Sequence, residues 1–396
     1  MLSNFQHNSR VISDLYNFIG KNKEAISEWL GKYKKGIMPI YTSVDVRYSG
    51  FKIAAVDTNL FPAGFNNLSD KCFKIAIDSL KEYINNNFKQ IKKIALIPEN
   101  FDRNKGYFQN LFSIYNILTQ AGYDVRIVSP DVSDIVYNEN LNSLAIHPVL
   151  QKNAFLVTRD GWIPDMILLN NDLTEGVPEI LHDIKQPILP KPNQGWHKRR
   201  KFNHYQAYNR IIEDFCKTFA LDPWLFTTFS KKCYNVNFKE KKGLACIATH
   251  VDEILNKIRN KYSQYDITED PYVFIKADKG TFGMGIITVR SGKEVLEINK
   301  KTRHSINKIK GGVENLEIVI QEGVPTALKV ENFPAEAVLY AIGGKVVAKF
   351  YRYNKLKDKY CNLNSKGMVL TESYQKYTFI DELIGAICTI AVLHEV

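Results

Sequence analysis

Apolar residues recur at helical spacing in the N-terminal part of the chain and then gather into short runs. Residues 11–35 place apolar side chains three or four positions apart, and residues 69–88 repeat this pattern. Both segments are therefore expected to be helical. Short apolar runs follow at 93–98, 123–129 and 166–169, with helical segments between the first two. Alternating strands and helices predict a parallel α/β sheet, with ligands at the carboxyl ends of its strands.

Two stretches interrupt these patterns. Residues 43–67 show no periodicity and predict a long loop, and loops of that kind often carry function. Residues 186–195 are rich in proline, which cannot propagate a helix, and we place a domain boundary there. A helical region is expected after it, over residues 196–265.

Residues 272–289 consist of two apolar runs joined by a loop with glycines at 280, 283 and 285. The second run is rich in β-branched residues, so it predicts a returning strand rather than the helix that follows a Walker A or dinucleotide loop. Glycines let a backbone approach phosphates closely, and Lys276 on the first strand adds a positive charge. The segment predicts either a flap over a polyphosphate or a plain hairpin with a glycine loop.

A second hairpin is predicted nearer the C-terminus. Residues 337–342 and 345–352 read as strands, and Gly343–Gly344 between them is a two-residue turn signal. The fold class that follows is α/β, with α+β character in the C-terminal half. Its first domain, residues 1–190, is a parallel α/β domain, and its second spans 191–396.

Length and composition narrow the class of protein. With 396 residues, 45% hydrophobic and 24% charged, the chain has the composition of a folded globular protein of two or three domains. No apolar run approaches the roughly 18–20 residues that cross a bilayer, and the first ten residues lack the apolar core of a secretory signal. We therefore expect a cytoplasmic protein with no membrane partner.

The cysteines and the charge add two further expectations. The six cysteines are scattered without a Cys-x-x-Cys pair, which favours buried reduced thiols and no zinc centre. The net charge of +11 is spread along the chain, and no nucleic-acid module accompanies it. One basic cluster, residues 197–201, could be a solvated face, a site for a small anion or a nucleic-acid patch. A nucleic-acid partner is not expected.

The order of motifs in the C-terminal half resembles that of the ATP-grasp ligases, and especially their glutathione-synthetase-like members. The lysine strand and glycine flap come first, then a strand that ends at Gln321, then Glu336, Arg352 and residues 362–367. The resemblance implies an ATP-grasp domain over 191–396, preceded by a substrate-binding domain over 1–190. Its parts are a helical lead-in at 196–265, the flap at 272–289, a hinge at 321–325 and metal-binding strands at 336–367.

Roles follow from the resemblance residue by residue. Arg352 and Lys276 become catalytic, because in that family an arginine steadies the reacting phosphate and a lysine on the strand before the flap contacts the nucleotide phosphate. Mg2+ would be held by Glu336, Asn362 and Asn364. The implied ATP-binding residues are Lys201, Lys276, Gly280, Gly283, Gly285, Gln321, Glu322 and Val324. For the first lysine that contacts the nucleotide, we select Lys201, and the competing candidates are Lys198, Lys231 and Lys232. A second acidic metal ligand is frequent in the family, but Tyr360 occupies its place here, and Asp358 or Glu372 could substitute.

The N-terminal half narrows the resemblance. Residues 43–68, together with 195–201 and 276–285, resemble the proteobacterial glutamate-cysteine ligases. This implies ATP-dependent joining of the L-glutamate γ-carboxylate to the L-cysteine amine through an acyl phosphate, the first step of glutathione biosynthesis. ATP and Mg2+ are the implied cofactors, the partners are small-molecule substrates, and an oligomer is left open.

Two amino-acid substrates bring carboxylates and ammonium groups, which need cationic and anionic side chains respectively. The candidates are Arg47, Lys52, Arg199 and Arg200 for carboxylates, Asp45 and Asp57 for ammonium groups, and Asn59, Asn66 and Asn67 for orientation. Two alternatives stay open at this point. One is another ATP-grasp ligase, such as one that makes glutathione, and the other is an ATP-binding regulator without catalysis.

Overall fold

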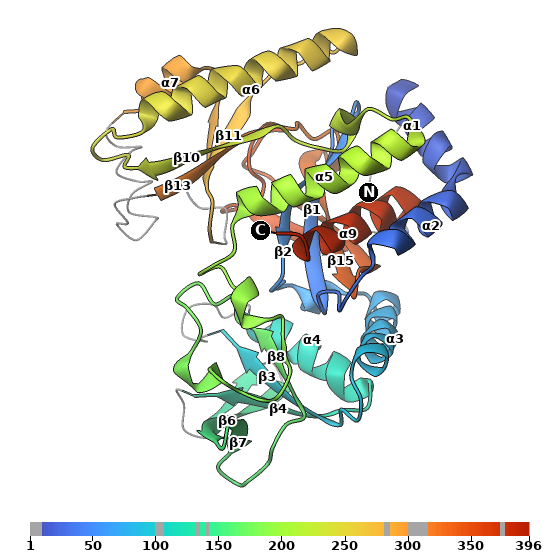
Figure 1. Cartoon of the computed structure of the whole chain (residues 1–396), viewed down its shortest axis with the longest axis vertical. Coiled ribbons are helices and arrows are strands. Elements are labelled where there is room, and N and C mark those ends of the chain that lie inside the picture. The colour runs from blue at the N-terminus through green and yellow to red at the C-terminus, as the bar shows by residue number, and fades with distance from the viewer. Residues whose placement is uncertain are drawn as a thin grey trace.

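Three β-sheets and the helices around them make up the part of the molecule that the structure describes. The computed structural model describes residues 10–99, 107–130, 135–139, 142–280, 286–299, 316–372 and 377–395. The sheets follow one another along the long axis of the molecule (Figure 1). A parallel sheet lies at one end, a six-stranded antiparallel sheet in the middle and a four-stranded antiparallel sheet at the other end.

The parallel sheet is built from residues 93–189 and confirms the predicted α/β fold. Its order is β5-β6-β4-β3-β8-β9, with β7 paired to β6. All pairings from β6 to β9 along this order are parallel, whereas β5 and β7 run antiparallel to β6. Its strands are β3 (Lys93–Pro98), β4 (Asp124–Ser129), β5 (Ile135–Glu139), β6 (Asn142–Lys152), β7 (Phe155–Thr158), β8 (Met166–Asn170) and β9 (Ile188–Leu189).

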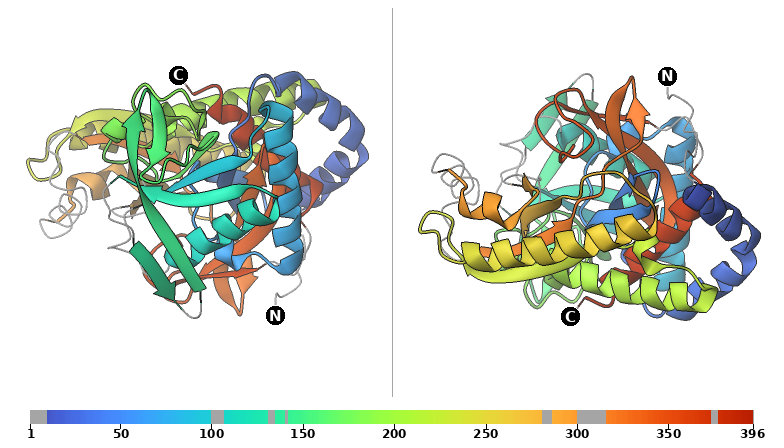
Figure 2. Two further views of the ribbon diagram at one scale, coloured as in Figure 1. Left: turned by 90° about the horizontal axis from the view of Figure 1, so that it is seen from below. Right: turned by 90° about the horizontal axis from the view of Figure 1, so that it is seen from above.

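Both faces of this sheet are buried, which explains its nearly continuous apolar strands. Ile94 and Leu96 belong to the main core together with residues of α3 (Asp70–Asn87) and α4 (Tyr107–Gln120). Ala95 and Ile97 alternate with them and belong to a second, smaller core on the opposite face. Figure 2 shows α3 and α4 on one side of the sheet.

The middle sheet joins the first strands of the chain to the last. Its order is β17-β16-β15-β1-β2, with β14 paired to β15, and all of its pairings are antiparallel. Its strands are β1 (Tyr41–Tyr48), β2 (Ile53–Asn59), β14 (Lys329–Val330), β15 (Phe333–Ile342), β16 (Lys345–Asn354) and β17 (Met368–Glu372). The predicted hairpin over Gly343–Gly344 is confirmed, and both glycines have positive φ.

Two sequence expectations need correction here. Residues 43–67 are not one long loop, because most of them form β1, β2 and the short helix η1 (Phe65–Asn67). Strand β1 pairs with β15, so one sheet contains strands from before and after the domain boundary that we predicted near residue 190. The first sixty residues therefore contribute to the same structural unit as residues 329–372.

Helices cover the middle sheet. Helix α9 (Phe379–Val392) contacts β1, β2, β15 and β16, and α5 (Lys201–Phe219), α1 (Arg10–Lys21) and α2 (Lys23–Tyr33) pack against α9. Thr378 begins α9 with a capping box, in which its side chain and that of Asp381 exchange hydrogen bonds with backbone amides. Short helices η3 (Glu179–Leu181), η4 (Pro192–Gln194) and η5 (Pro223–Leu225) lie in the connections.

The third sheet contains the predicted flap strands. Its order is β10-β13-β11-β12, formed by β10 (Ser230–Val236), β11 (Val273–Ala277), β12 (Ile287–Val289) and β13 (Leu316–Glu322). Strands β11 and β12 are antiparallel, as predicted. Helix α6 (Leu244–Gln264) packs on this sheet, and α7 (Gly292–Leu296) packs against α6. Strand β10 interrupts the region that we expected to be helical throughout.

The cysteines differ from expectation at two positions. Cys233 on β10 and Cys246 on α6 form a disulfide, and His250 lies beside them with its Nδ1 3.3 Å from Cys233 Sγ. Cys72, Cys216, Cys361 and Cys388 are free thiols, as expected, but only Cys216 and Cys388 of these four are buried. Separately, no helix within the described ranges has the length and apolar character needed to cross a membrane.

Candidate active site

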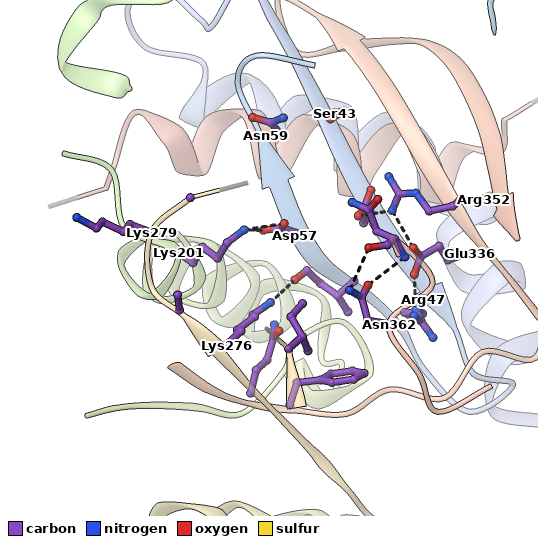
Figure 3. A pocket seen from close by; sticks show the side chains of 18 of the residues that line it. Ser43, Arg47, Asp57, Asn59, Lys201, Lys276, Lys279, Glu336, Arg352 and Asn362 are labelled. Atoms are coloured by element: carbon purple, nitrogen blue, oxygen red, sulfur yellow. Dashed lines mark hydrogen bonds and ion pairs between the residues drawn. The ribbon is translucent and has the colours of Figure 1, made fainter. Parts of the chain in front are cut away.

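A polar cavity lies where one face of the middle sheet meets strands β11 and β13. Strands β1, β2, β15 and β16 contribute Asp45, Asp57, Glu336 and Arg352, and β11 contributes Lys276 from the other side. Figure 3 shows these elements converging on the cavity. The remaining residues that line it are Ser43, Arg47, Val56, Asn59, Trp196, Lys201, Phe274, Ala277, Lys279, Gly280, Ile286, Gln321, Asn362 and Asn364.

Strand geometry explains why the N-terminal residues meet here. Alternate side chains of a strand point to the same face, so Ser43, Asp45 and Arg47 of β1 all reach the cavity. Asp57 and Asn59 do the same on β2, and Asp57 pairs in register with Asp45. One face of a single hairpin therefore carries most of the polar N-terminal residues at the site.

Four charged side chains on this face of the middle sheet form a chain of ion pairs (Figure 3). Arg352 Nη1 donates to Asp45 Oδ2 at 2.6 Å and to Glu336 Oε1 at 2.8 Å. Arg47 Nε donates to the other Glu336 oxygen, Oε2, at 2.6 Å. The Glu336 carboxylate is therefore held between two guanidinium groups.

Burial and these charges shift the pKa of both carboxyl groups. Burial raises the pKa of Glu336, but the charges of Arg47 and Arg352 outweigh it and leave the pKa below its usual range. Burial also raises the pKa of Asp45, and the nearby Glu336 charge adds to that shift, while Arg352 opposes it. Of these two carboxyl groups, Glu336 is the one whose ionised form the surrounding charges favour.

The two predicted phosphate lysines lie on the opposite side of the cavity from this network (Figure 3). Lys201 Nζ donates to both oxygens of Asp57 at 2.7 Å, and Lys276 Nζ donates to the Val56 carbonyl oxygen at 3.2 Å. Burial lowers the pKa of Lys276 to about 8, although Asp57 partly opposes this shift. Burial would raise the pKa of Asp57, but Lys201 and Lys276 bring it below its usual range.

Helix α5 and the flap position these lysines. The Lys201 amide donates to the Asp278 carbonyl oxygen at 2.8 Å, and the Phe202 amide donates to Asp278 Oδ1 at 2.7 Å. This ties the start of α5 to the end of β11. Gly280 lines the cavity with a φ of 92°, which glycine adopts without strain. Gly283 and Gly285 fall outside the described residues.

Several predicted residues are not brought to the cavity. Lys52 and Glu322 are buried together in an ion pair, with Nζ 2.8 Å from Oε1. Arg199 pairs with Glu395 and Arg200 with Glu317. Asn66 and Asn67 lie on η1, and Val324 is buried outside the cavity lining. Gln321 is thus the hinge residue that contacts the cavity directly.

Residues that the sequence reading missed also line the cavity, notably Ser43, Trp196 and Phe274. Ser43 would have been found by reading residues 43–47 as a strand, since it alternates with Asp45. Trp196 precedes the basic cluster, and its ring lies 4.7 Å from Lys201 Nζ. Phe274 precedes Lys276 by two positions, which places both side chains on the same face of β11.

The predicted metal ligands fit Mg2+ by their chemistry, because all three offer oxygen atoms to one cavity. Each Glu336 oxygen accepts one guanidinium hydrogen bond and keeps a second lone pair. Asn362 Oδ1 accepts from the Asn364 amide at 3.1 Å, which fixes the turn that carries both residues. The position where the family often has a second acidic ligand holds Tyr360, whose hydroxyl donates to Glu269. Asp358, which could have replaced that ligand, is exposed and does not line the cavity.

Comparison with known proteins identifies the family of this chain. The model of the glutamate-cysteine ligase family matches residues 17–381. A solved structure from Methylobacillus flagellatus KT, provisionally named a gamma-glutamylcysteine synthetase, is similar over 100% of this chain and 97% of its own. It has 32% sequence identity and a TM-score of 0.89.

A D-alanyl-alanine synthetase A from Vibrio cholerae O1 biovar eltor str. N16961 matches 77% of this chain and 81% of its own. Its sequence identity is 11% and its TM-score is 0.36, values too low to indicate a shared fold or function. No curated protein matches. With a family model over nearly all of its length and a solved relative of the same fold, the chain belongs to the glutamate-cysteine ligase family.

Proposed function

We propose that this ATP-dependent ligase joins the γ-carboxylate of L-glutamate to the amine of L-cysteine, as the first step of glutathione biosynthesis. The observation that carries the proposal is one cavity in which the family's N-terminal hairpin and the C-terminal lysine, glutamate and arginine residues converge. The cavity is also cationic. Of its described lining residues, five are lysine or arginine and three are carboxylates, which suits a polyphosphate and a reacting carboxylate.

The reaction needs an activated carboxylate, because an amine does not displace hydroxide from a carboxylate in water. Transfer of the ATP γ-phosphoryl group to glutamate would give an acyl phosphate, which the cysteine amine attacks to form the amide and release phosphate. Such a transfer depends mainly on positioning and on neutralising the phosphate oxygens. Lys201 and Lys276 are the residues that we assign to the ATP phosphates, and Gln321 to the adenine side.

Arg352 is assigned to the reacting phosphoryl group. Among the described residues its Nε is a buried donor with no acceptor, while Nη1 is held by Asp45 and Glu336. A buried unpaired donor is costly, and an anionic oxygen would relieve that cost. Glu336, Asn362 and Asn364 would hold Mg2+, which when bound neutralises charge on the transferred phosphate.

Asp57 and Arg47 are our candidates for the substrate ammonium and carboxylate groups. Each lies on the cavity face of the N-terminal hairpin, and each has a partner of opposite charge already in place. Their orientation is therefore set before a substrate binds, which reduces the entropy lost on binding. A cytoplasmic location is part of this proposal, since ATP and reduced cysteine are available there.

The test is a reaction with the purified full chain, ATP, Mg2+, glutamate and cysteine. Expected is release of ADP that depends on both amino acids, with γ-glutamylcysteine identified by mass spectrometry. The Glu336→Gln variant is expected to keep its fold and lose turnover. ADP release that requires γ-glutamylcysteine and glycine would instead indicate a glutathione synthetase. ATP binding without turnover over a panel of amino acids would indicate a regulator.

A further inference from the structure

Two cysteines and a histidine meet where helix α6 packs against strand β10 (Figure 1). Cys233 is buried on β10, whereas Cys246 and His250 lie one turn apart on α6, at positions that share a helix face. His250 Nδ1 is 3.3 Å from Cys233 Sγ and 3.8 Å from Cys246 Sγ. In the part of the chain that the structure describes, this is the only group of three histidine, cysteine or acidic residues whose ligand atoms all lie within 4.8 Å of one another.

These separations fit the ligands of one zinc ion. With Zn–S bonds of about 2.3 Å, Zn–N bonds of about 2.0–2.1 Å and tetrahedral angles, a sulfur and a nitrogen ligand lie roughly 3.6 Å apart, and two sulfur ligands roughly 3.8 Å apart. Both sulfur–nitrogen distances are already within about 0.3 Å of that separation. The two sulfur atoms, which are joined as a disulfide, would have to separate, and the exposed side chain of Cys246 has room to turn.

The surroundings of the cluster favour thiolate ligands. Cys246 is the third residue of α6, where the partial positive charge of the helix N-terminus stabilises a thiolate. Lys231 lies two positions before Cys233 on the same face of β10, and its ammonium group pairs with Glu253 of α6 at 3.4 Å. Thiolates and imidazole select Zn2+ over Mg2+, which prefers oxygen ligands. The cluster is also separate from the active-site cavity, whose described lining contains no cysteine or histidine.

A reducing compartment would open the disulfide between these cysteines. The proposed reaction uses the reduced thiol of cysteine, and a compartment that supplies this thiol keeps protein thiols reduced as well. In the exchange, two molecules of a low-molecular-weight thiol give up two electrons and two protons and become one disulfide, while Cys233 and Cys246 become thiols. The covalent link between α6 and β10 is then lost. Cysteines in such a compartment more often bind metal than form lasting disulfides.

We propose that reduced Cys233 and Cys246, together with His250 Nδ1, bind one Zn2+ ion, which links α6 to β10 as the disulfide does in the oxidised chain. Binding releases the two thiol protons to solvent and leaves two thiolates and a neutral imidazole on the metal. Three protein ligands leave the fourth tetrahedral position to a water molecule. The disulfide and the zinc site exclude each other, because both use the same sulfur atoms. The inference rests on the proposed function only for the reducing compartment.

Co2+ binding to the reduced full chain tests the site without any turnover, because Co2+ bound to thiolates shows a sulfur-to-cobalt charge-transfer absorption that oxygen ligands do not give. One equivalent of Co2+ should produce this absorption, and one equivalent of Zn2+ should abolish it. Cys246→Ser and His250→Gln should each weaken Zn2+ binding, measured by competition with a chromophoric chelator, at least about tenfold, since even residues behind metal ligands contribute that much. Cys72→Ser, which removes a free thiol on α3, is the control and should bind Zn2+ like the wild type.

Thermal unfolding tests the link between α6 and β10. Zn2+ should raise the melting temperature of the reduced wild type and leave that of Cys246→Ser, a change at an exposed position, where it was. The proposal is overturned if the reduced wild type gives no charge-transfer absorption, or if Cys246→Ser and His250→Gln keep wild-type zinc affinity. Equal zinc affinity of the oxidised and reduced chains, or a melting temperature that Zn2+ does not change, would also contradict it. Failure of the wild type to make γ-glutamylcysteine would reject the proposed function while leaving these affinities interpretable.

Discussion

Lys52 offers the sharpest test, because the sequence and the structure assign it different roles. The sequence reading makes it a ligand of a substrate carboxylate. In the structure its side chain is 0% exposed, and its Nζ lies 2.8 Å from Glu322 Oε1 and 4.2 Å from the centre of the Trp224 ring. The pair joins the turn after β1 to the end of β13. We therefore predict that Lys52→Met reduces stability and does not remove a substrate contact.

The magnitude follows from what Lys52→Met leaves behind. Breaking a buried ion pair by removing one partner costs about 3–5 kcal/mol, because the remaining charge is buried without compensation. Glu322 keeps two donors, Trp224 Nε1 and the Phe229 amide, both at 3.0 Å. These contacts place the expected loss near the lower limit, about 3 kcal/mol. For a cooperative unit of 150–250 residues this corresponds to a melting temperature lower by roughly 6–12 °C.

The assay compares thermal unfolding with steady-state kinetics measured well below the melting temperature. Lys345→Met is the control, because Lys345 and Glu82 form an exposed pair at 3.7 Å. Exposed pairs contribute little, so this control should melt within a degree or two of the wild type. The reasoning is refuted if Lys52→Met melts like the control while its KM for glutamate or cysteine rises by an order of magnitude or more.

Three further predictions concern pH and the hinge. Burial lowers the pKa of Lys276 to about 8, so the KM for ATP should rise between pH 7 and 9 as this lysine loses its charge, and Lys276→Arg should flatten that rise. Burial raises the pKa of Glu99 to about 7, so the folded state resists ionisation of this group and loses stability as the pH rises toward 7. Glu99→Gln should therefore stabilise the protein by at most about 3 kcal/mol at pH 8 and by almost nothing at pH 4, as denaturant titrations would show. A side chain at Gly323 would overlap the ring of Tyr272, so Gly323→Ala should cost about 1–3 kcal/mol and weaken binding of an ATP analogue measured by calorimetry; an analogue affinity equal to that of the wild type would show that the ring can move aside freely.

Local patterns were sufficient for some elements and not for others. The strands at 93–98 and 166–170 could be predicted because parallel strands buried on both faces are short apolar runs. Residues 43–47 were misread although their valines alternate with polar residues, because the polar face points into a cavity and not to solvent. Strand β10 was missed for a related reason, since the charge of Lys232 is neutralised by Asp278 at 2.6 Å.

The site itself depends on information that local patterns do not contain. The types of Glu336 and Arg352 and their order along the chain could be matched to a family. The contact of Asp45 with Arg352 could not, because it is set by the register of β1 on β15. The burial of Lys52 against Glu322 is equally non-local and turned a predicted ligand into a structural residue.

The pairing of β1 with β15 also has a consequence for the order in which the protein is made. Arg47 and its partner Glu336 are 289 positions apart in the chain. At translation rates of about 5–20 residues per second, roughly 15–60 s pass between synthesis of the β1–β2 hairpin and synthesis of β15, the strand that pairs with β1. During that interval the unpaired edge of β1 and its charged face are available to other strands or to chaperones. The active site would therefore form only late in synthesis, after β15 and β16 have left the ribosome.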